Sequence, residues 1–291
     1  MATILTIANQ KGGVGKTTNA VNLASALAEE LEKKVLLIDG DYQGNATSAV
    51  GVLGSHSGLA NAILQKALFT NFVVSSKKQP LVDVLPGTKD LNNIGQTFSE
   101  LERNIMIDPV LGVVRHGATF QKTTALKGYD YVIIDTHPSL DSLLTAAMAV
   151  SDGLVIPLFP EKSSVEGLKL VYGWYNQAKV LNANLVITGC LVTNFDQNNA
   201  THKVFLNQIR LLPEKHRIPV FDTVIPSSKS VAGASAVSQS LFQYRGQSPI
   251  AQSYRSLAKE IDALYKDTQI TLIEPPVVEK PADIELAIDI D

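Results

Sequence analysis

Short apolar runs alternate with longer amphipathic stretches along most of the chain. The first two runs, at 3–8 and 35–38, are almost wholly apolar, which is typical of strands buried on both faces. Similar runs follow at 81–85, 131–134, 154–158, 185–192 and 220–225. Because stretches long enough for helices separate most of them, we expect an α/β fold with a doubly wound, mostly parallel sheet and helices on both faces.

Helices are expected where apolar residues recur every three or four positions. This spacing predicts helices at about 16–33, 163–181, 200–212 and 249–266. The stretch 87–128 follows neither a strand nor a helix pattern clearly and is not assigned.

Composition narrows the class of protein. The 291 residues are 45% hydrophobic and 18% charged, which excludes a disordered, collagen-like or disulfide-stapled chain. No apolar run approaches the roughly 20 residues of a spanning helix, and the N-terminus lacks the basic region of a secretion signal. We therefore expect a cytoplasmic protein. The lone cysteine, Cys190, lies in an apolar run and is expected to be a buried strand residue.

Charge is spread unevenly. Residues 269–291 hold six acidic residues against one lysine and include three prolines. This composition predicts a flexible acidic tail at 269–291 after a single folded domain at 1–268. Because the whole chain has a net charge of -3, the domain itself is more basic than that value indicates.

A glycine-rich loop stands between the first predicted strand and the first predicted helix. Residues 10–18 read QKGGVGKTT, in the context in which a P-loop is meaningful. Backbone amides of such a loop converge on phosphate oxygens, while Lys16 reaches the β- and γ-phosphates and Thr17 binds Mg²⁺. Gln10 replaces the usual first glycine, and Lys11 adds a second lysine. A glycine turn without a ligand is the alternative, but it would leave two lysines repelling each other. The loop therefore predicts a site for MgATP or MgGTP in a P-loop NTPase fold.

Acidic residues follow two of the predicted strands. Asp39 and Asp41 come after the run at 35–38, and Asp135 comes after the run at 131–134. The carboxyl ends of parallel strands meet at one edge of a sheet, where a ligand binds. One carboxylate there can hold a water bound to Mg²⁺ and another can orient the attacking water. Taken singly, each acid could equally be a loop or cap residue.

These motifs resemble those of the ParA/MinD group of deviant Walker-A ATPases, and most of all the ParA-type partition ATPases. The resemblance covers roughly 1–267. It is carried by KGGVGKTT at 11–18, DGDYQGNAT at 39–47, IIDTHPSL at 133–140, Pro160-Glu161 with Glu166-Gly167-Leu168, and TVIP at 223–226.

The resemblance implies ATP and Mg²⁺ as cofactors and gives individual residues their roles. Lys11 would reach the phosphates of the partner subunit in a dimer that sandwiches two nucleotides, and Asp41 would orient the attacking water. Asp135 would be the Walker-B acid, and Asp39 would support Mg²⁺ indirectly, through the groups that contact the ion. The implied nucleotide contacts are Lys11, Gly12, Gly13, Val14, Gly15, Lys16, Thr17, Thr18 and, at the adenine, Asn194 and Pro226.

Three positions depart from the family pattern. Tyr42 and His137 stand where the family usually has proline, so the two segments that respond to nucleotide are expected to move differently here. We interpret His137 as a packing residue because no acid-base partner is visible in the sequence. Gly233 stands where the family often has glutamate.

The resemblance also implies partners. ParA-type proteins form a homodimer with ATP, bind duplex DNA without sequence preference, and release it after hydrolysis stimulated by a ParB-like or cargo-adaptor protein. This implies a nucleoid-associated protein that moves a plasmid, a chromosome or a protein assembly such as carboxysomes or chemoreceptor clusters. A dimer doubles a basic surface and so strengthens DNA binding. Candidate DNA contacts are Lys203, Arg210, Lys215, Arg217, Lys229, Arg245 and Arg255, although any one of them could be an ordinary solvated residue.

Other functions on the same fold remain open, except one. A MinD-like membrane-associated ATPase would need a basic amphipathic helix at the C-terminus, whereas this tail is acidic and contains prolines. A metabolic ATP-dependent enzyme would need a second set of polar residues for a small substrate. A reductase like the nitrogenase iron protein is excluded, because it needs two cluster-ligating cysteines and only Cys190 is present.

Overall fold

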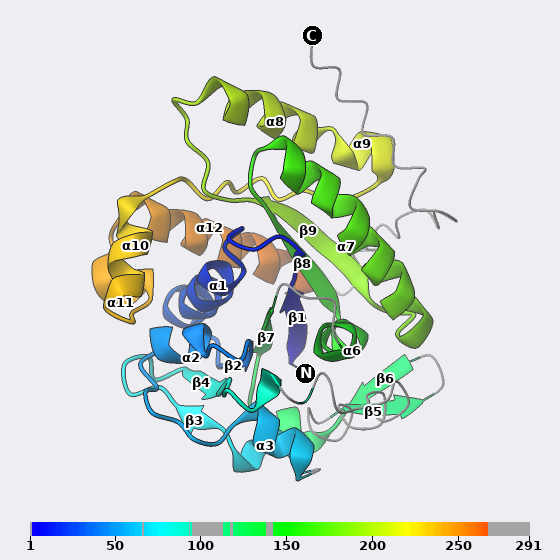
Figure 1. Cartoon of the computed structure of the whole chain (residues 1–291), viewed down its shortest axis with the longest axis vertical. Helices are drawn as coiled ribbons and strands as arrows, with labels where there is room; N and C mark the ends of the chain where they lie inside the picture. Colours follow the sequence, from blue (N-terminus) through cyan, green and yellow to red (C-terminus); the bar gives the residue numbers. More distant parts are fainter. Residues whose placement is uncertain are drawn as a thin grey trace.

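The computed structural model describes residues 2–65, 67–92, 94, 113–116, 119–137 and 142–266. Seven strands of these residues form one sheet in the order β3-β4-β2-β7-β1-β8-β9 (Figure 1). In chain order they are β1 (Thr3–Ile7), β2 (Val35–Gly40), β3 (Val74–Ser75), β4 (Val82–Leu85), β7 (Tyr131–Thr136), β8 (Gly153–Leu158) and β9 (Val186–Val192). All neighbours are parallel except the edge strand β3, which runs antiparallel to β4. The predicted fold class is confirmed.

Helices cover both faces of the sheet, which explains why the strands are apolar throughout. In β1, Leu5 and Ile7 pack into one hydrophobic cluster and Ile4 into another on the opposite face. The first cluster includes α1 (Lys16–Leu31) and α12 (Pro249–Lys266). The opposite face is covered by α3 (Leu59–Leu64), α6 (Ser142–Val150), α7 (Lys162–Leu181) and α8 (Ala200–Arg210).

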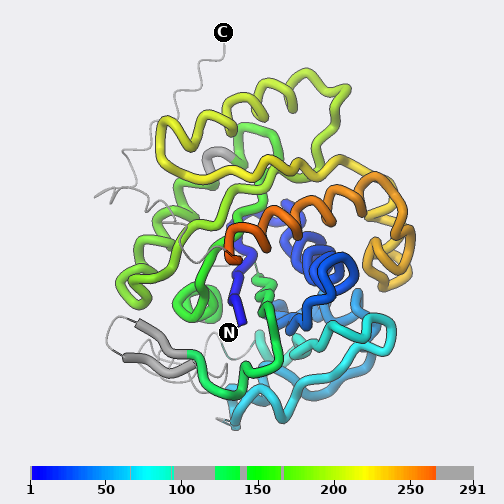
Figure 2. Tube along the Cα trace, turned by 180° about the vertical axis from the view of Figure 1, so that it is seen from behind, coloured from blue at the N-terminus to red at the C-terminus, as the bar shows by residue number. Residues whose placement is uncertain are grey.

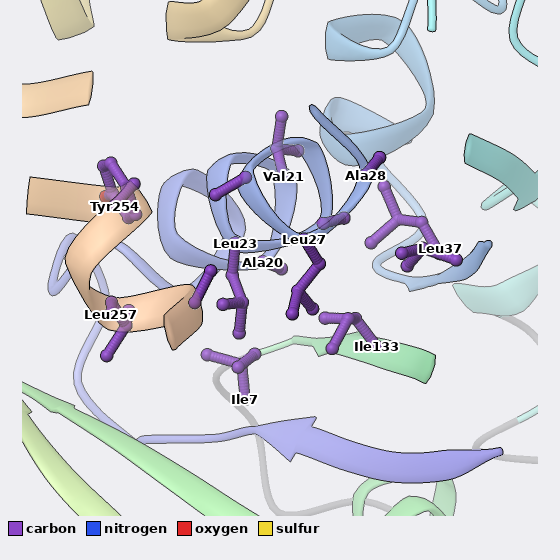
Figure 3. Close-up of a cluster of buried hydrophobic side chains, with 14 of the residues drawn as sticks. Ile7, Ala20, Val21, Leu23, Leu27, Ala28, Leu37, Ile133, Tyr254 and Leu257 are labelled. Atoms are coloured by element: carbon purple, nitrogen blue, oxygen red, sulfur yellow. The ribbon is translucent and has the colours of Figure 1, made fainter. Parts of the chain in front are cut away.

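The first helix, α1, is held from two sides. Its Leu23 and Leu27 point toward Ile7 of β1 and Ile133 of β7 (Figure 3). α12 runs alongside α1 on the same face of the sheet (Figure 2), and the buried Tyr254 hydroxyl donates a hydrogen bond of 2.8 Å to Oδ1 of Asn19. This packing fixes the N-terminus of α1, where the glycine-rich loop ends.

Several short elements have no counterpart in the hydrophobic pattern of the sequence. They are α2 (Asn45–Ala49), η1 (Phe69–Asn71), the hairpin β5 (Val113–His116) with β6 (Thr119–Lys122), η2 (Thr124–Leu126), α9 (Leu212–His216), α10 (Lys229–Ala236) and α11 (Leu241–Arg245). Each has eight residues or fewer, too few to show a hydrophobic period. Part of the unassigned stretch 87–128 lies outside the described residues.

The apolar run at 220–225 differs from the expectation of a strand. It lies beside β9 but forms only one isolated bridge with it, between Cys190 and Val220; a second bridge, just beyond both segments, joins Phe195 to Pro226. The amides of Asp222 and Thr223 donate instead to the carboxylate of Glu260 at 2.7 and 3.1 Å. Those two amides are therefore not available to donate hydrogen bonds to a neighbouring strand.

Two further expectations concern burial and membranes. Cys190 is fully buried in β9, as predicted, and burial raises the pKa of its thiol to about 12. Within the described ranges, every helix is too short or too polar to span a bilayer. The predicted acidic tail at 269–291 lies outside the described residues.

Candidate nucleotide site

The loop between β1 and α1 presents its backbone to open space. Gly13 and Gly15 have φ angles of 76° and 84°, in the left-handed region that favours glycine. A Cβ atom on Gly12 or Gly13 would meet nothing within 4 Å, while Val14 between the glycines is buried and anchors the loop. The exposed amides and the N-terminus of α1 together form a cradle that fits a chain of phosphates.

Lys16 places its ammonium group inside this loop. The side chain is buried, and Nζ donates to the carbonyl oxygen of Lys11 at 3.1 Å. Burial lowers the pKa of Lys16, and the negative charges of Asp135 and Asp41 act in the opposite direction. A cation that is poorly solvated and close to carboxylates is well suited to contact phosphate oxygens.

Lys11 points away from the loop, toward the start of α7. Its Nζ donates to Oγ of Ser163 at 2.7 Å and forms an ion pair with Glu161. The backbone is also fixed, because Asn9 accepts from the amide of Lys11 at 3.0 Å and donates to the carbonyl of Pro157 at 2.7 Å. The two lysines beside the loop therefore have separate environments, which reduces their mutual repulsion.

The acids of β2 and β7 lie side by side, as expected. Asp39 pairs in register with Asp135 across the two strands. The carboxylate of Asp39 is saturated by nearby donors: Oδ2 accepts from the amide and hydroxyl of Thr47 at 2.8 and 2.6 Å, and Oδ1 accepts from the amide of Asp41 at 3.1 Å. Burial raises the pKa of Asp39, and these hydrogen bonds act against it. Asp39 thus holds the segment that leads into α2.

Asp135 is surrounded in a different way. It is fully buried, and neither carboxylate oxygen has a hydrogen-bond partner among the described residues. Burial and the charges of Asp39 and Asp41 raise the pKa of Asp135 well above its usual range, although the nearby Thr17 hydroxyl and Lys16 partly offset this.

The oxygen atoms of Thr17 and Asp135 fit Mg²⁺. Within the described ranges no three acidic, histidine or cysteine side chains gather into a metal cage. Mg²⁺ commonly keeps several waters and takes one or two protein ligands beside substrate phosphates. A hydroxyl at Thr17 and an unpartnered carboxylate at Asp135 provide such a set, and Asp39 stands behind it.

Asp41 lies close enough to Lys16 and Asp135 for its charge to act on both of them. It is 7% exposed, and its Oδ1 accepts from the amide of Gln43 at 2.9 Å. Gly87 follows β4 and approaches this segment so closely that a Cβ atom would stand 2.4 Å from the carbonyl oxygen of Asp41. The close approach of Gly87 therefore limits where the Asp41 segment can move.

The two residues expected near adenine lie together at the same edge of the sheet. Asn194 follows β9 with a φ of 54°, and the next residue, Phe195, bridges to Pro226. The amide of Ser227 donates to the carbonyl of Phe195 at 2.8 Å. This arrangement keeps Asn194 and Pro226 close, as a shared contact surface requires.

The departures from the family pattern have structural partners. The rings of Tyr42 and His137 lie 5.1 Å apart between centroids, with a 40° angle between planes. At Gly233, a Cβ atom would stand 2.6 Å from the hydroxyl of Tyr244, so a glutamate would not fit without a shift of that ring. His137 is thus in ring contact with Tyr42, and its packing role stays a prediction.

Two side chains of the site have roles that the sequence alone does not reveal. Thr47 stands in the sequence only as part of a motif, yet it clamps Asp39, and Glu161 stands only beside Pro160, yet it holds Lys11. Each lies on a different element from its partner. In the sequence, only their position in the segments that follow strands β2 and β8 indicates that they could lie near the site.

The candidate DNA contacts differ in their availability. Lys203 and Arg210 on α8, Lys229 at the start of α10, and Arg245 at the end of α11 are exposed. Arg255 is engaged instead: its guanidinium donates to the carbonyl of Gly246 at 2.7 Å and pairs with Glu30 at 3.2 Å. Arg255 therefore stabilises the contact between α12 and α1 and has little capacity left for a phosphate.

Comparisons with known proteins agree with this geometry. A family model described as an AAA domain matches residues 2–187. The chain is 36% identical over 265 residues to the chromosome-partitioning ATPase Soj of Thermus thermophilus, covering 89% of this chain and 95% of that protein.

Solved structures also match most of the chain. A putative plasmid partition protein from Borrelia burgdorferi B31, bound to AMPPNP, superposes with a TM-score of 0.68 at 26% identity over 91% of this chain and 99% of its own. A cobyrinic acid a,c-diamide synthase from Mycobacterium smegmatis, with an ATP analogue and magnesium, has a TM-score of 0.73 at 23% identity, covering 92% of this chain and 97% of its own. The second likeness concerns the fold alone.

Proposed function

Because the chain belongs to the ParA/MinD family of P-loop ATPases, with Soj among its relatives, we propose that it is a nucleotide-controlled DNA-binding ATPase. It binds MgATP, dimerises, holds duplex DNA without sequence preference, and releases the DNA after hydrolysis. This cycle segregates or positions a cargo. The partner that stimulates hydrolysis is a ParB-like or cargo-adaptor protein, and the protein works at the nucleoid.

The observation that carries the proposal is the separation of two lysines at one phosphate loop. Lys16 lies inside the loop, buried, while Lys11 extends to Ser163 at 2.7 Å. Lys16 contacts the phosphates of the nucleotide that is bound to its own chain. Lys11 is left for the phosphates of a second subunit, so that dimerisation depends on bound ATP.

The residues of the site divide the work of hydrolysis. Backbone amides of the loop and Lys16 bind the phosphates and offset their charge. Thr17 and Asp135 would hold Mg²⁺, which supplies charge neutralisation at the phosphates when it is bound. Asp41 orients the attacking water, and its geometry is supported by the amide of Gln43 at 2.9 Å.

Lys11 must leave its present partners before it can serve another subunit. Its ion pair with Glu161 is partly exposed, with side-chain exposures of 36% and 34%. Exposed pairs contribute only about 0–1 kcal/mol, whereas an ammonium group on a phosphate in a dimer interface is shielded from water and binds more strongly. Bound ATP therefore shifts Lys11 toward the dimer.

DNA binding is expected to follow from dimerisation. The exposed cations Lys203, Arg210, Lys229 and Arg245 are the candidate contacts. Each phosphate neutralised releases condensed counterions, so affinity grows steeply when two subunits present their cations together. Contacts of this kind carry no sequence preference.

The dimerisation step is tested by light scattering with MgATP on the Asp41→Ala protein, which is expected to retain ATP. We expect a dimer with ATP and a monomer with ADP. Adding Lys11→Ala should abolish the dimer while ATP still binds. Lys162→Ala is the matched control, since it removes an exposed lysine next to Glu161, and it should leave the dimer intact. An ATP-dependent dimer in the Lys11→Ala protein would remove Lys11 from its role.

A further inference from the structure

Two aromatic side chains join the ends of neighbouring strands beside the phosphate loop. Tyr42 lies three residues after Asp39 of β2, and His137 directly follows Thr136 at the end of β7. Their ring centroids are 5.1 Å apart with the planes tilted by 40°, a geometry favourable for an aromatic contact. The contact connects the segment that follows β2 with the residue that follows β7.

Each ring belongs to a residue that lies within two positions of an acid of the candidate site in the sequence. Tyr42 is adjacent in sequence to Asp41, the residue proposed to orient water, and His137 is two residues from Asp135. The backbone of the first segment is tied to Asp39 through the amide of Asp41 at 3.1 Å. A contact between the rings therefore fixes the distance between the Asp41 segment and the end of β7.

The contact has room to open. Tyr42 is half-buried and also lines a cavity of about 440 Å³. Other side chains of this cavity include Gln43, Thr47 and His56. The cavity therefore leaves space beside the ring of Tyr42 into which it can turn away from His137. A ring that can be either in contact with His137 or turned away from it is the kind of element that a bound nucleotide can bias.

Neither Tyr42 nor His137 restricts the backbone by itself, as a proline would. The aromatic contact therefore supplies the restraint between the two segments, and it does so only when both rings are present.

We propose that Tyr42 and His137 form a latch between these two segments and act as positioning residues for ATP hydrolysis. The proposal rests on the proposed ATPase function for its effect on turnover. The latch itself does not depend on that function. Closed, it holds Asp41 where it can orient water; open, it leaves nucleotide binding intact and slows the chemical step.

The latch is tested first without nucleotide, by amide hydrogen exchange. His137→Ala should speed exchange of the amides at 43–47 by up to about tenfold, the change expected from losing one aromatic contact. His202→Ala is the control for losing a histidine ring elsewhere: it removes a ring pair with Phe159 at the same centroid distance of 5.1 Å, together with the acceptor of the Asp196 amide. Unchanged exchange at 43–47 in the His137→Ala protein would overturn the proposal.

Turnover is tested by a double-mutant cycle of Tyr42→Ala and His137→Ala. Each single variant should lower kcat by about tenfold with KM within about twofold, and the double variant should be no slower than either one. Tyr42→Phe keeps the ring and should retain the wild-type kcat. Additive losses, or a change in KM alone, would contradict a shared positioning role. If the wild-type protein hydrolyses no ATP, the ATPase proposal fails, and the exchange measurement still decides whether the latch exists.

Discussion

Asp39 and Asp135 occupy equivalent places in the molecule but have opposite surroundings. They face each other in register at the ends of β2 and β7, and both are fully buried. Asp39 accepts three hydrogen bonds, from Thr47 and Asp41. Asp135 accepts none from the described residues. The nearby Thr17 hydroxyl and Lys16 ammonium offset the cost of burying the Asp135 carboxylate only in part, so a ligand is expected there, whereas Asp39 has a complete structural role without one.

The comparison shows what a strand-end acid can and cannot tell. Position at the carboxyl edge follows from the run of apolar residues before it, and this prediction is confirmed for both acids. The division of roles depends on Thr47, which comes from α2 and reaches back to Asp39 at 2.6 Å. Acids in equivalent positions therefore need their neighbours on other elements before a role can be assigned.

The largest effect is expected from removing the cation that faces Asp135. Lys16→Ala should lower the affinity for MgATP at least about a hundredfold, because a buried charge-assisted contact to phosphate is lost. Asp135 then stands without its nearest positive charge. Calorimetric titration of MgATP measures the change, and circular dichroism checks that the variant is folded. Tight binding in a folded Lys16→Ala protein would refute the phosphate assignment.

A substitution at Asp41 is expected to affect the chemical step and not the binding of ATP. Asp41→Ala should bind MgATP and dimerise but lower kcat by about a hundredfold, a loss typical of one preorganised group at a reacting centre. Steady-state phosphate release gives kcat, and calorimetry gives the affinity. Wild-type turnover in this variant would move the water-orienting role to another residue.

Replacing Asp135 and Asp39 in turn by asparagine tests whether the two acids have different roles. Asp135→Asn should weaken ATP binding about tenfold or more in Mg²⁺ and little in its absence, because a charged Mg²⁺ ligand is lost. Asp39→Asn should instead destabilise the fold by about 1–3 kcal/mol, since hydrogen bonds to a charged acceptor are weakened. Titrations with and without Mg²⁺ and urea unfolding measure the two effects. The same response from both variants would show that the acids are not distinct.

The smallest effect concerns pH. Burial raises the pKa of Asp135 in the folded chain, so the folded state holds a proton that the unfolded state releases above pH about 4. Stability is therefore lost as pH rises from there through the folded pKa. Asp135→Asn removes this loss, so its stability relative to the wild type should rise as pH increases through that window. Urea unfolding from pH 4.5 to 7.5 tests this, and parallel stability curves would contradict it.

Much of the fold could be predicted from hydrophobic patterning. The long helices and buried strands are recognisable because each has an uninterrupted apolar face or core, as in α12, which spans Pro249–Lys266 as expected. Hydrophobic patterning does not predict the structure of the run at 220–225. Its pattern is that of a strand, but two of its amides donate to the carboxylate of Glu260. Short helices such as α2 form through capping and tertiary contacts that periodicity does not record.

The candidate site was predictable in its chemistry but not in its contacts. The loop, Lys16 and the strand-end acids follow from local sequence. The partners that decide how they act come from elsewhere in the chain: Ser163 at Lys11 and the ring of His137 at Tyr42. Such pairs depend on the packing of whole elements, which one sequence does not specify.

We propose that bound nucleotide controls the affinity of the protein for DNA. This control is tested most directly by binding of random-sequence duplex DNA to the Asp41→Ala protein, with ATP and with ADP, across a series of salt concentrations. We expect binding with ATP alone, falling steeply as salt rises because counterions are released from the phosphates. Equal binding in both nucleotide states, or no binding in either, would contradict the claim and favour a membrane-associated or metabolic ATPase.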